Sequence, residues 1–132
     1  MNVMYRLPAY DSVTADQLTK FKRTLSDEVS EIDDIVRECA GQASNVELRV
    51  MLADLLGDVV VYCHSEALKY GIPLDDVLNI IMASNESKLD TDGEPIYNAD
   101  GKFLKGTGYW QPEPQIRRLL LSHSHSTYRG AV

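Results

Sequence analysis

The stretch LLGDVVVYC, residues 55–63, carries one charged side chain, Asp58, inside an otherwise apolar run. An ionised carboxylate that leaves water without a partner is costly, so Asp58 needs a cation, hydrogen-bond donors or a metal ion nearby. If the run is helical, Asp54 stands one turn before Asp58 on the same face. Residues 50–68 contain no Lys or Arg, so two acids share a strip that has no cation of its own.

A second pair of acids interrupts another apolar pattern. Glu28 follows Leu25 by three residues and falls within the apolar stripe of a predicted helix, with Glu31 three residues further on the same side. Residues 24–36 contain no Lys or Arg either. Converging carboxylates raise one another's pKa unless a cation lies between them, and Mg²⁺ or Mn²⁺ prefers oxygen ligands. The metal site predicted in this way consists of Glu28, Glu31, Asp54 and Asp58.

Each pair alone has a simpler explanation, because acids three or four residues apart are common on solvated helix faces. The metal site is favoured because both pairs interrupt apolar stripes. The histidines are not predicted to be ligands, since His64 fits a helix surface and His123 and His125 lie in the polar end of the sequence.

Capping signals mark where two long helices begin. Thr14 is followed three residues later by Gln17, and Ser44 by Glu47, which is the pattern of a capping box. Gly71 is expected to end the second helix. Apolar periodicity then predicts three helices, over about residues 15–39, 45–70 and 74–88.

The sequence changes character after residue 89. Residues 90–112 are rich in Gly, Pro, Asp and Asn, and the turn residues 98–101 separate two short apolar runs, which predicts a β-hairpin within a loop. A short helix over about 113–121 follows. The whole chain, residues 1–132, is therefore predicted to be a single all-α domain, an antiparallel helical bundle with a short C-terminal hairpin.

The second helix is apolar on more than one side, so it cannot turn all of its apolar residues toward one neighbour. With few other helices to cover it, we expect a homo-oligomer, a homodimer or homotetramer, to complete the bundle. The residues concerned are Leu52, Leu55, Leu56, Val59, Val60, Val61, Tyr62 and Cys63.

Composition excludes several classes of protein. The chain has 132 residues, of which 44% are hydrophobic and 25% charged, as in ordinary soluble domains. Cys39 and Cys63 belong to no CxxC motif, and we expect a cytoplasmic protein with reduced thiols that does not enter a membrane. The net charge of −7 argues against nucleic-acid binding, although residues 101–132 carry five Lys or Arg against Glu113 alone.

The acidic pairs, Glu28-Val-Ser-Glu31 and Asp54-Leu-Leu-Gly-Asp58, together resemble the ExxE and (E/D)xxD motifs of the all-α nucleotide pyrophosphohydrolases. These form the MazG-like and phosphoribosyl-ATP pyrophosphohydrolase-like superfamily. The stretch NESKLD at 85–90, with DGEPIYNADGKFLKGTGYWQPEP after it, is similar to the phage and bacterial branch, and the resemblance covers roughly residues 20–120. One departure is that many members carry an acid at the position of Leu55, three residues before the last acid.

The resemblance implies hydrolysis of a nucleoside triphosphate between its α and β phosphates, which releases a nucleoside monophosphate and pyrophosphate. Mg²⁺ or Mn²⁺ held by Glu28, Glu31 and Asp58, helped by Asp54, would neutralise the phosphates. Glu31 is the residue expected to activate the attacking water.

Basic side chains late in the chain could bind the phosphates. Asn85 and Lys88 suit a phosphate contact, although a cation at a helix end also serves as a cap. Lys102 and Lys105 could close over the phosphates or remain solvated on the hairpin.

Tyr109 and Trp110 could stack on a base, or pack within the protein or against a partner. Two other classes of function also remain open. One is a non-catalytic helical interaction module, and the other is a phosphoribosyl-ATP pyrophosphohydrolase.

Overall fold

The structure, a computed structural model, describes residues 9–89, 93–94, 96–104 and 108–125, with side chains omitted at 103 and 123–125. Within these residues the chain is mostly helical, as predicted. It forms two compact units, Met1–Gly71 and Ile72–Val132, and each is considered by itself. The single-domain organisation stays a prediction. In the described part of the chain, no helix combines the length and apolarity needed to cross a membrane.

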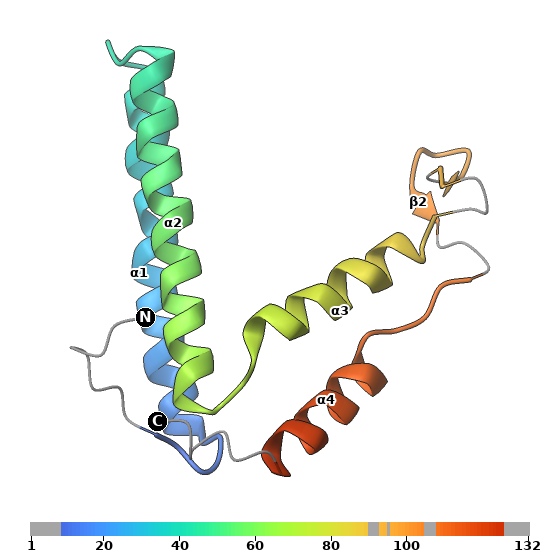
Figure 1. The fold of residues 1–132 in the computed structure, drawn as a ribbon. Helices are drawn as coiled ribbons and strands as arrows, with labels where there is room; N and C mark the ends of the chain where they lie inside the picture. The colour runs from blue at the N-terminus through green and yellow to red at the C-terminus, as the bar shows by residue number, and fades with distance from the viewer. Residues whose placement is uncertain (1–8, 90–92, 95, 105–107, 126–132) are drawn as a thin grey trace. The chain divides into compact units, whose positions relative to one another are not determined.

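The first unit is a pair of long helices, α1 (Ala15–Cys39) and α2 (Asn45–Lys69), which lie side by side (Figure 1). Their bounds follow the predicted ranges, except that α2 ends one residue earlier. Ser44 caps α2 by accepting a hydrogen bond from the backbone N–H of Glu47. Gly71 then adopts a φ of 66°, a left-handed conformation that ends a helix and that costs glycine least.

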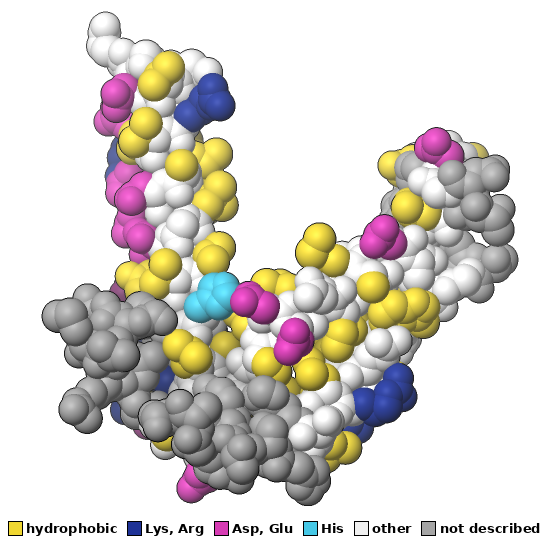
Figure 2. All heavy atoms as spheres, in the orientation of Figure 1, with side chains coloured by type: hydrophobic (Ala, Val, Ile, Leu, Met, Phe, Trp, Pro, Cys, Tyr) yellow, Lys and Arg dark blue, Asp and Glu magenta, His cyan; other side chains and the backbone are white. Residues whose placement is uncertain are grey.

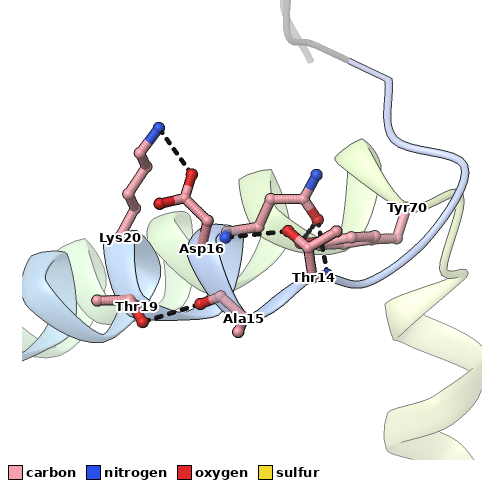
Figure 3. Close-up of polar contacts among 7 residues, drawn as sticks. Thr14, Ala15, Asp16, Thr19, Lys20 and Tyr70 are labelled. Carbon is pink, nitrogen blue, oxygen red and sulfur yellow. Dashed lines mark hydrogen bonds and ion pairs between the residues drawn. The ribbon is translucent and has the colours of Figure 1, made fainter.

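A capping box fixes the start of α1 and joins it to the end of α2 (Figure 3). The backbone N–H of Gln17 donates to Thr14 Oγ1 and the backbone N–H of Thr14 donates to Gln17 Oε1, each over 3.2 Å. The Tyr70 hydroxyl also donates to Gln17 Oε1, over 2.9 Å. The side chain that closes the cap therefore also ties the two helices together.

The segment before α1 packs on the same end of the helix pair. The backbone N–H of Tyr10 donates to the carbonyl oxygen of Lys69 over 2.7 Å. The rings of Tyr10 and Tyr70 lie with centroids 5.3 Å apart at an angle of 48°, a favourable tilted arrangement of aromatic rings. Burial, and after it the charge of Glu66, raises the pKa of Tyr70, so its hydroxyl stays protonated as a donor.

The second unit contains α3 (Leu74–Glu86), β1 (Ile96–Tyr97), β2 (Phe103–Leu104) and α4 (Glu113–His125), with α3 and α4 in contact. β1 and β2 pair antiparallel, Ile96 opposite Leu104 and Tyr97 opposite Phe103. Asn98 organises the turn between them, because its Oδ1 accepts from the backbone N–H groups of Asp100 and Lys102.

Two predicted helix ends were wrong. α3 stops at Glu86 rather than 88, because Lys88 and Leu89 donate to carbonyls three residues back, which tightens the chain into turns. α4 continues to His125 rather than 121. The four added residues, Ser, His, Ser and His, include no Gly or Pro that would stop a helix.

Apolar side chains remain exposed along the α1–α2 pair (Figure 2). On α2, Leu56, Val60 and Val61 are 54%, 54% and 59% exposed, while on the same helix only Leu55 and Ala67 are buried. This distribution agrees with the expectation that α2 is apolar on more than one side. The homodimer or homotetramer stays a prediction.

Two glycines of the first unit should respond oppositely to alanine. Gly57 lies within α2 and a Cβ there meets nothing within 4 Å, so Gly57→Ala should stabilise the fold by about 0.5–1 kcal/mol. Gly71→Ala should cost about 1–2 kcal/mol, because alanine resists the φ of 66°. Urea unfolding followed by circular dichroism measures both. A loss of stability in Gly57→Ala would mean that another chain packs closely on this position.

Candidate functional site

Glu28 is a buried carboxylate on α1. Its side chain is only 5% exposed, and one of its oxygens, Oε2, has no hydrogen-bond partner. Buried polar atoms in proteins are nearly always paired, so an unpaired carboxylate oxygen indicates a missing cation or donor. Glu28 is the one buried residue of α1, although the apolar side chains Val29 and Val36 of the same helix are exposed.

Three other side chains act on Glu28. Burial raises the pKa of Glu28 most, and the charges of Glu31 and Asp58 and a hydrogen bond with Asp58 raise it further. A hydrogen bond with the Tyr62 hydroxyl lowers that pKa in part. Glu28, Glu31, Asp58 and Tyr62 therefore form one group, the acid cluster, with members on α1 and α2.

Tyr62 stays protonated within the acid cluster. The charge of Glu28, followed by burial and the charge of Asp58, raises the pKa of the Tyr62 hydroxyl. A neutral phenol is a hydrogen-bond donor, so it can hold the carboxylate of Glu28 in place. In the sequence analysis Tyr62 counts only among the apolar residues of the second helix. Its position four residues after Asp58, one helical turn, was the signal that could have identified it.

The structure separates Asp54 from the cluster. Asp54 and Leu55 precede Asp58 by four and three residues, so they lie on opposite sides of it, about 40° and about 60° around the helix. Leu55 occupies the buried side, with 5% of its surface exposed, whereas Asp54 is exposed. The interactions that raise the pKa of Glu28 come from Glu31 and Asp58 and not from Asp54. Of the two residues one turn before Asp58, Leu55 is therefore the one that faces the interior.

The side chains of the acid cluster are not arranged as the ligands of a metal ion. Among the described residues, no group of three or more His, Cys, Asp or Glu side chains is arranged to hold a metal ion. Glu31 is exposed and Asp58 is half-buried, so both can turn toward Glu28 more readily than a fully buried side chain could. The metal assignment stays a prediction.

The predicted phosphate-binding residues lie in the second unit. Lys88 Nζ lies 5.7 Å from the centre of the Tyr109 ring, within reach of a cation–π interaction. Asn85 is exposed on α3, and Lys102 is exposed in the hairpin turn. Lys105 lies outside the described residues.

Trp110 is held to α3 through its backbone. Its carbonyl oxygen accepts from Ser84 Oγ over 2.8 Å, and its N–H donates to Ser87 Oγ over 3.2 Å. Ser84 is only 1% exposed, and the bond to Trp110 satisfies its hydroxyl, as is usual for a buried polar group. These bonds fix the Tyr109–Trp110 segment beside the end of α3 and give Trp110 a structural environment.

The fold has a counterpart among solved proteins. A crystal structure from Exiguobacterium sp. 255-15, named "putative NTP pyrophosphohydrolase", superposes with a TM-score of 0.57. The match covers 88% of this chain and 69% of the other at 19% identity, which shows a shared fold. No protein-family model and no curated protein sequence matches the chain.

Removing the charge of Glu28 should stabilise the protein when a chelator removes divalent cations. Because the folded state raises its pKa, ionised Glu28 opposes folding, and this penalty grows as the pH rises above 4.5 and through the raised pKa. Glu28→Gln should therefore melt above the wild type at pH 7.5, and the difference should shrink toward pH 4. Thermal melting across this range measures the effect.

The matched control for this charge removal is Asp33→Asn, which changes an exposed acid on the same helix. Its melting temperature should stay close to that of the wild type at both pH values. A melting temperature for Glu28→Gln below that of the wild type at pH 7.5 would contradict the argument, because it would mean that the Glu28 charge is already compensated.

Proposed function

We propose that the protein is a metal-dependent nucleoside triphosphate pyrophosphohydrolase that cleaves between the α and β phosphates. The observation that carries the proposal is the buried Glu28, with an unpaired oxygen and two further acids acting on it. The motif resemblance supports the reaction, and the solved structure of similar fold bears the name of such an enzyme. The products are a nucleoside monophosphate and pyrophosphate.

The donor set suits Mg²⁺ or Mn²⁺. Glu28, Glu31 and Asp58 offer carboxylate oxygens, the ligands that hard divalent cations take, and Glu28 Oε2 needs a partner. Such an ion would neutralise the negative charge of the triphosphate and make a bound water more acidic. Asp54, exposed on the flank of α2, would assist from a greater distance.

Two further roles in the proposed reaction are assigned to Tyr62 and Glu31. Tyr62 would hold the Glu28 carboxylate by donating its hydroxyl hydrogen. Glu31, which is exposed, can reach a solvent molecule, so we assign it as the group that takes the proton from the attacking water. The water oxygen bonds to the α phosphorus while the bond to the bridging oxygen breaks, and pyrophosphate leaves.

Lys88 and Asn85, in the second unit, stay predicted phosphate-binding residues on the strength of the motif resemblance. Lys88 supplies a compact charge, and its position over the Tyr109 ring restricts where that charge can lie. Lys102 and Lys105 would add charge from the hairpin. The backbone of Trp110 is bonded to α3, which fixes the position of this residue in the second unit.

One observation favours a different function. The exposed apolar side chains on α2 would also suit a non-catalytic helical interaction module. That class predicts no turnover, whereas a phosphoribosyl-ATP pyrophosphohydrolase predicts turnover of that substrate alone.

The reaction is tested by incubating the protein with ribo- and deoxyribonucleoside triphosphates and Mg²⁺ or Mn²⁺, with separation of all phosphate products. We expect a monophosphate and pyrophosphate, and no products when a chelator is added. Asp58→Asn and Glu31→Gln should each lower kcat/KM at least about 100-fold, the upper end of what losing a residue that supports a metal ligand costs.

Asp33→Asn, which removes an exposed charge from α1, is the control and should keep full activity. Asp54→Asn should have an intermediate effect, because that acid is exposed and is not among the groups that act on the pKa of Glu28. Full turnover by Asp58→Asn would show the metal assignment to be wrong, and diphosphate with free phosphate as products would exclude the proposed bond.

A further inference from the structure

The first unit contains a cavity of about 300 Å³ that no role described so far uses. It lies between α1, α2 and the segment before α1, and this volume is at the lower end of small-molecule sites. Three aromatic residues line it, Tyr10, Phe21 and Tyr62, together with the hydroxyl-bearing residues Thr24 and Ser65. The lining thus combines flat apolar surfaces with hydrogen-bonding groups.

The cavity continues directly from the acid cluster. Thr24 stands one helical turn before Glu28 on α1, and Tyr62 stands one turn after Asp58 on α2. Tyr62 belongs to both places, because it lines the cavity and lies close enough to Glu28 for its hydroxyl to lower the pKa of that carboxyl. From Glu28 the helix rises about 6 Å to Thr24 and about 10 Å to Phe21. A ligand held at the acids would extend into the cavity over that distance.

The charges around the cavity are already paired. Lys20 Nζ lies 3.3 Å from Asp16 Oδ2, an exposed pair shown in Figure 3. Lys69 Nζ lies 3.3 Å from Glu66 Oε1, and this pair is mostly buried. Because each lysine has an acid beside it, the cavity offers little net attraction to a free phosphate, and a neutral group fits it better.

We propose that this cavity receives the nucleoside of the substrate while the acid cluster receives the phosphates. The proposal rests on the proposed function and adds where the base and sugar lie. The sugar would lie by Thr24 and Tyr62, whose hydroxyls can bond to its own, and the base would lie among the rings of Phe21 and Tyr10.

Gln17 gives the base end of the cavity a fixed polar group. Its Oε1 accepts from the backbone N–H of Thr14 and from the Tyr70 hydroxyl, which sets the orientation of the amide. The amide nitrogen carries two hydrogens that suit a carbonyl or ring nitrogen of a base. Because the capping box already holds the Gln17 side chain, binding of a base would cost little conformational entropy at this residue.

The test compares two ligands that share the phosphates and differ in the nucleoside. The full chain is assayed with the best nucleoside triphosphate of the panel, and inorganic tripolyphosphate is titrated as an inhibitor. Ser65→Phe, which fills the cavity, should raise KM at least about tenfold, on the scale of losing one stacked base, and leave inhibition by tripolyphosphate unchanged. Ser30→Phe is the matched control, an exposed position on α1 outside the cavity, and should change neither value.

A second variant covers the case in which Ser65→Phe does not fold. Phe21→Leu keeps an apolar side chain and removes the ring, so KM should rise about fivefold with tripolyphosphate inhibition unchanged. An unchanged KM in a folded variant would overturn the subsite. Equal weakening of both ligands would overturn it as well, because the damage would not be specific to the nucleoside.

Calorimetric titration with the same nucleotide separates this proposal from the reaction. Turnover that survives in Ser65→Phe with an unchanged KM leaves the proposed function standing and removes the nucleoside site. Nucleotide binding without pyrophosphate release, lost in Ser65→Phe, removes the reaction and keeps the site. Neither binding nor turnover of any nucleotide in the panel overturns both.

Discussion

A carboxylate buried between two helices makes the strongest physical demand in the first unit. Glu28 lies almost out of contact with water, with one oxygen unpaired and with Glu31 and Asp58 close enough to raise its pKa. Burial and like charge both favour the protonated form, while only the Tyr62 hydroxyl favours the ionised one. A cation bound beside Glu28 would offset both the cost of burying its charge and the repulsion from Glu31 and Asp58.

The far end of the same helix pair supports the acid cluster. Gln17 closes the cap of α1 and receives the hydroxyl of Tyr70, while Tyr10 packs on the Tyr70 ring. These contacts link the start of α1 to the end of α2 and fix how the two helices meet at this end. The cavity lies next to them, lined by Tyr10 and Tyr62, and Tyr62 also acts on Glu28. The cap therefore helps to position the cavity and the acid cluster.

In the second unit, serine hydroxyls position the segment that contains Tyr109 and Trp110. Ser84 and Ser87 bond to both backbone groups of Trp110, and this holds the Tyr109 ring near Lys88 at the end of α3. Two buried or half-buried hydroxyls thus position a loop segment and one cation. Bonding of this kind depends on residues more than twenty positions apart, so no local pattern in the sequence revealed it.

The sequence by itself determined most helix bounds, because caps such as Thr14 and the stop at Gly71 act through neighbouring residues. It also identified Asp58 and Glu28 as acids inside apolar stripes. It could not set the rotation of α2 about its axis, since a helix that is apolar on several sides has no single inward face. Only the tertiary structure turned Leu55 inward in place of an acid, brought Tyr62 close to Glu28 and formed a partly open cavity beside them. Those outcomes depend on how two helices meet, and neither helix encodes that alone.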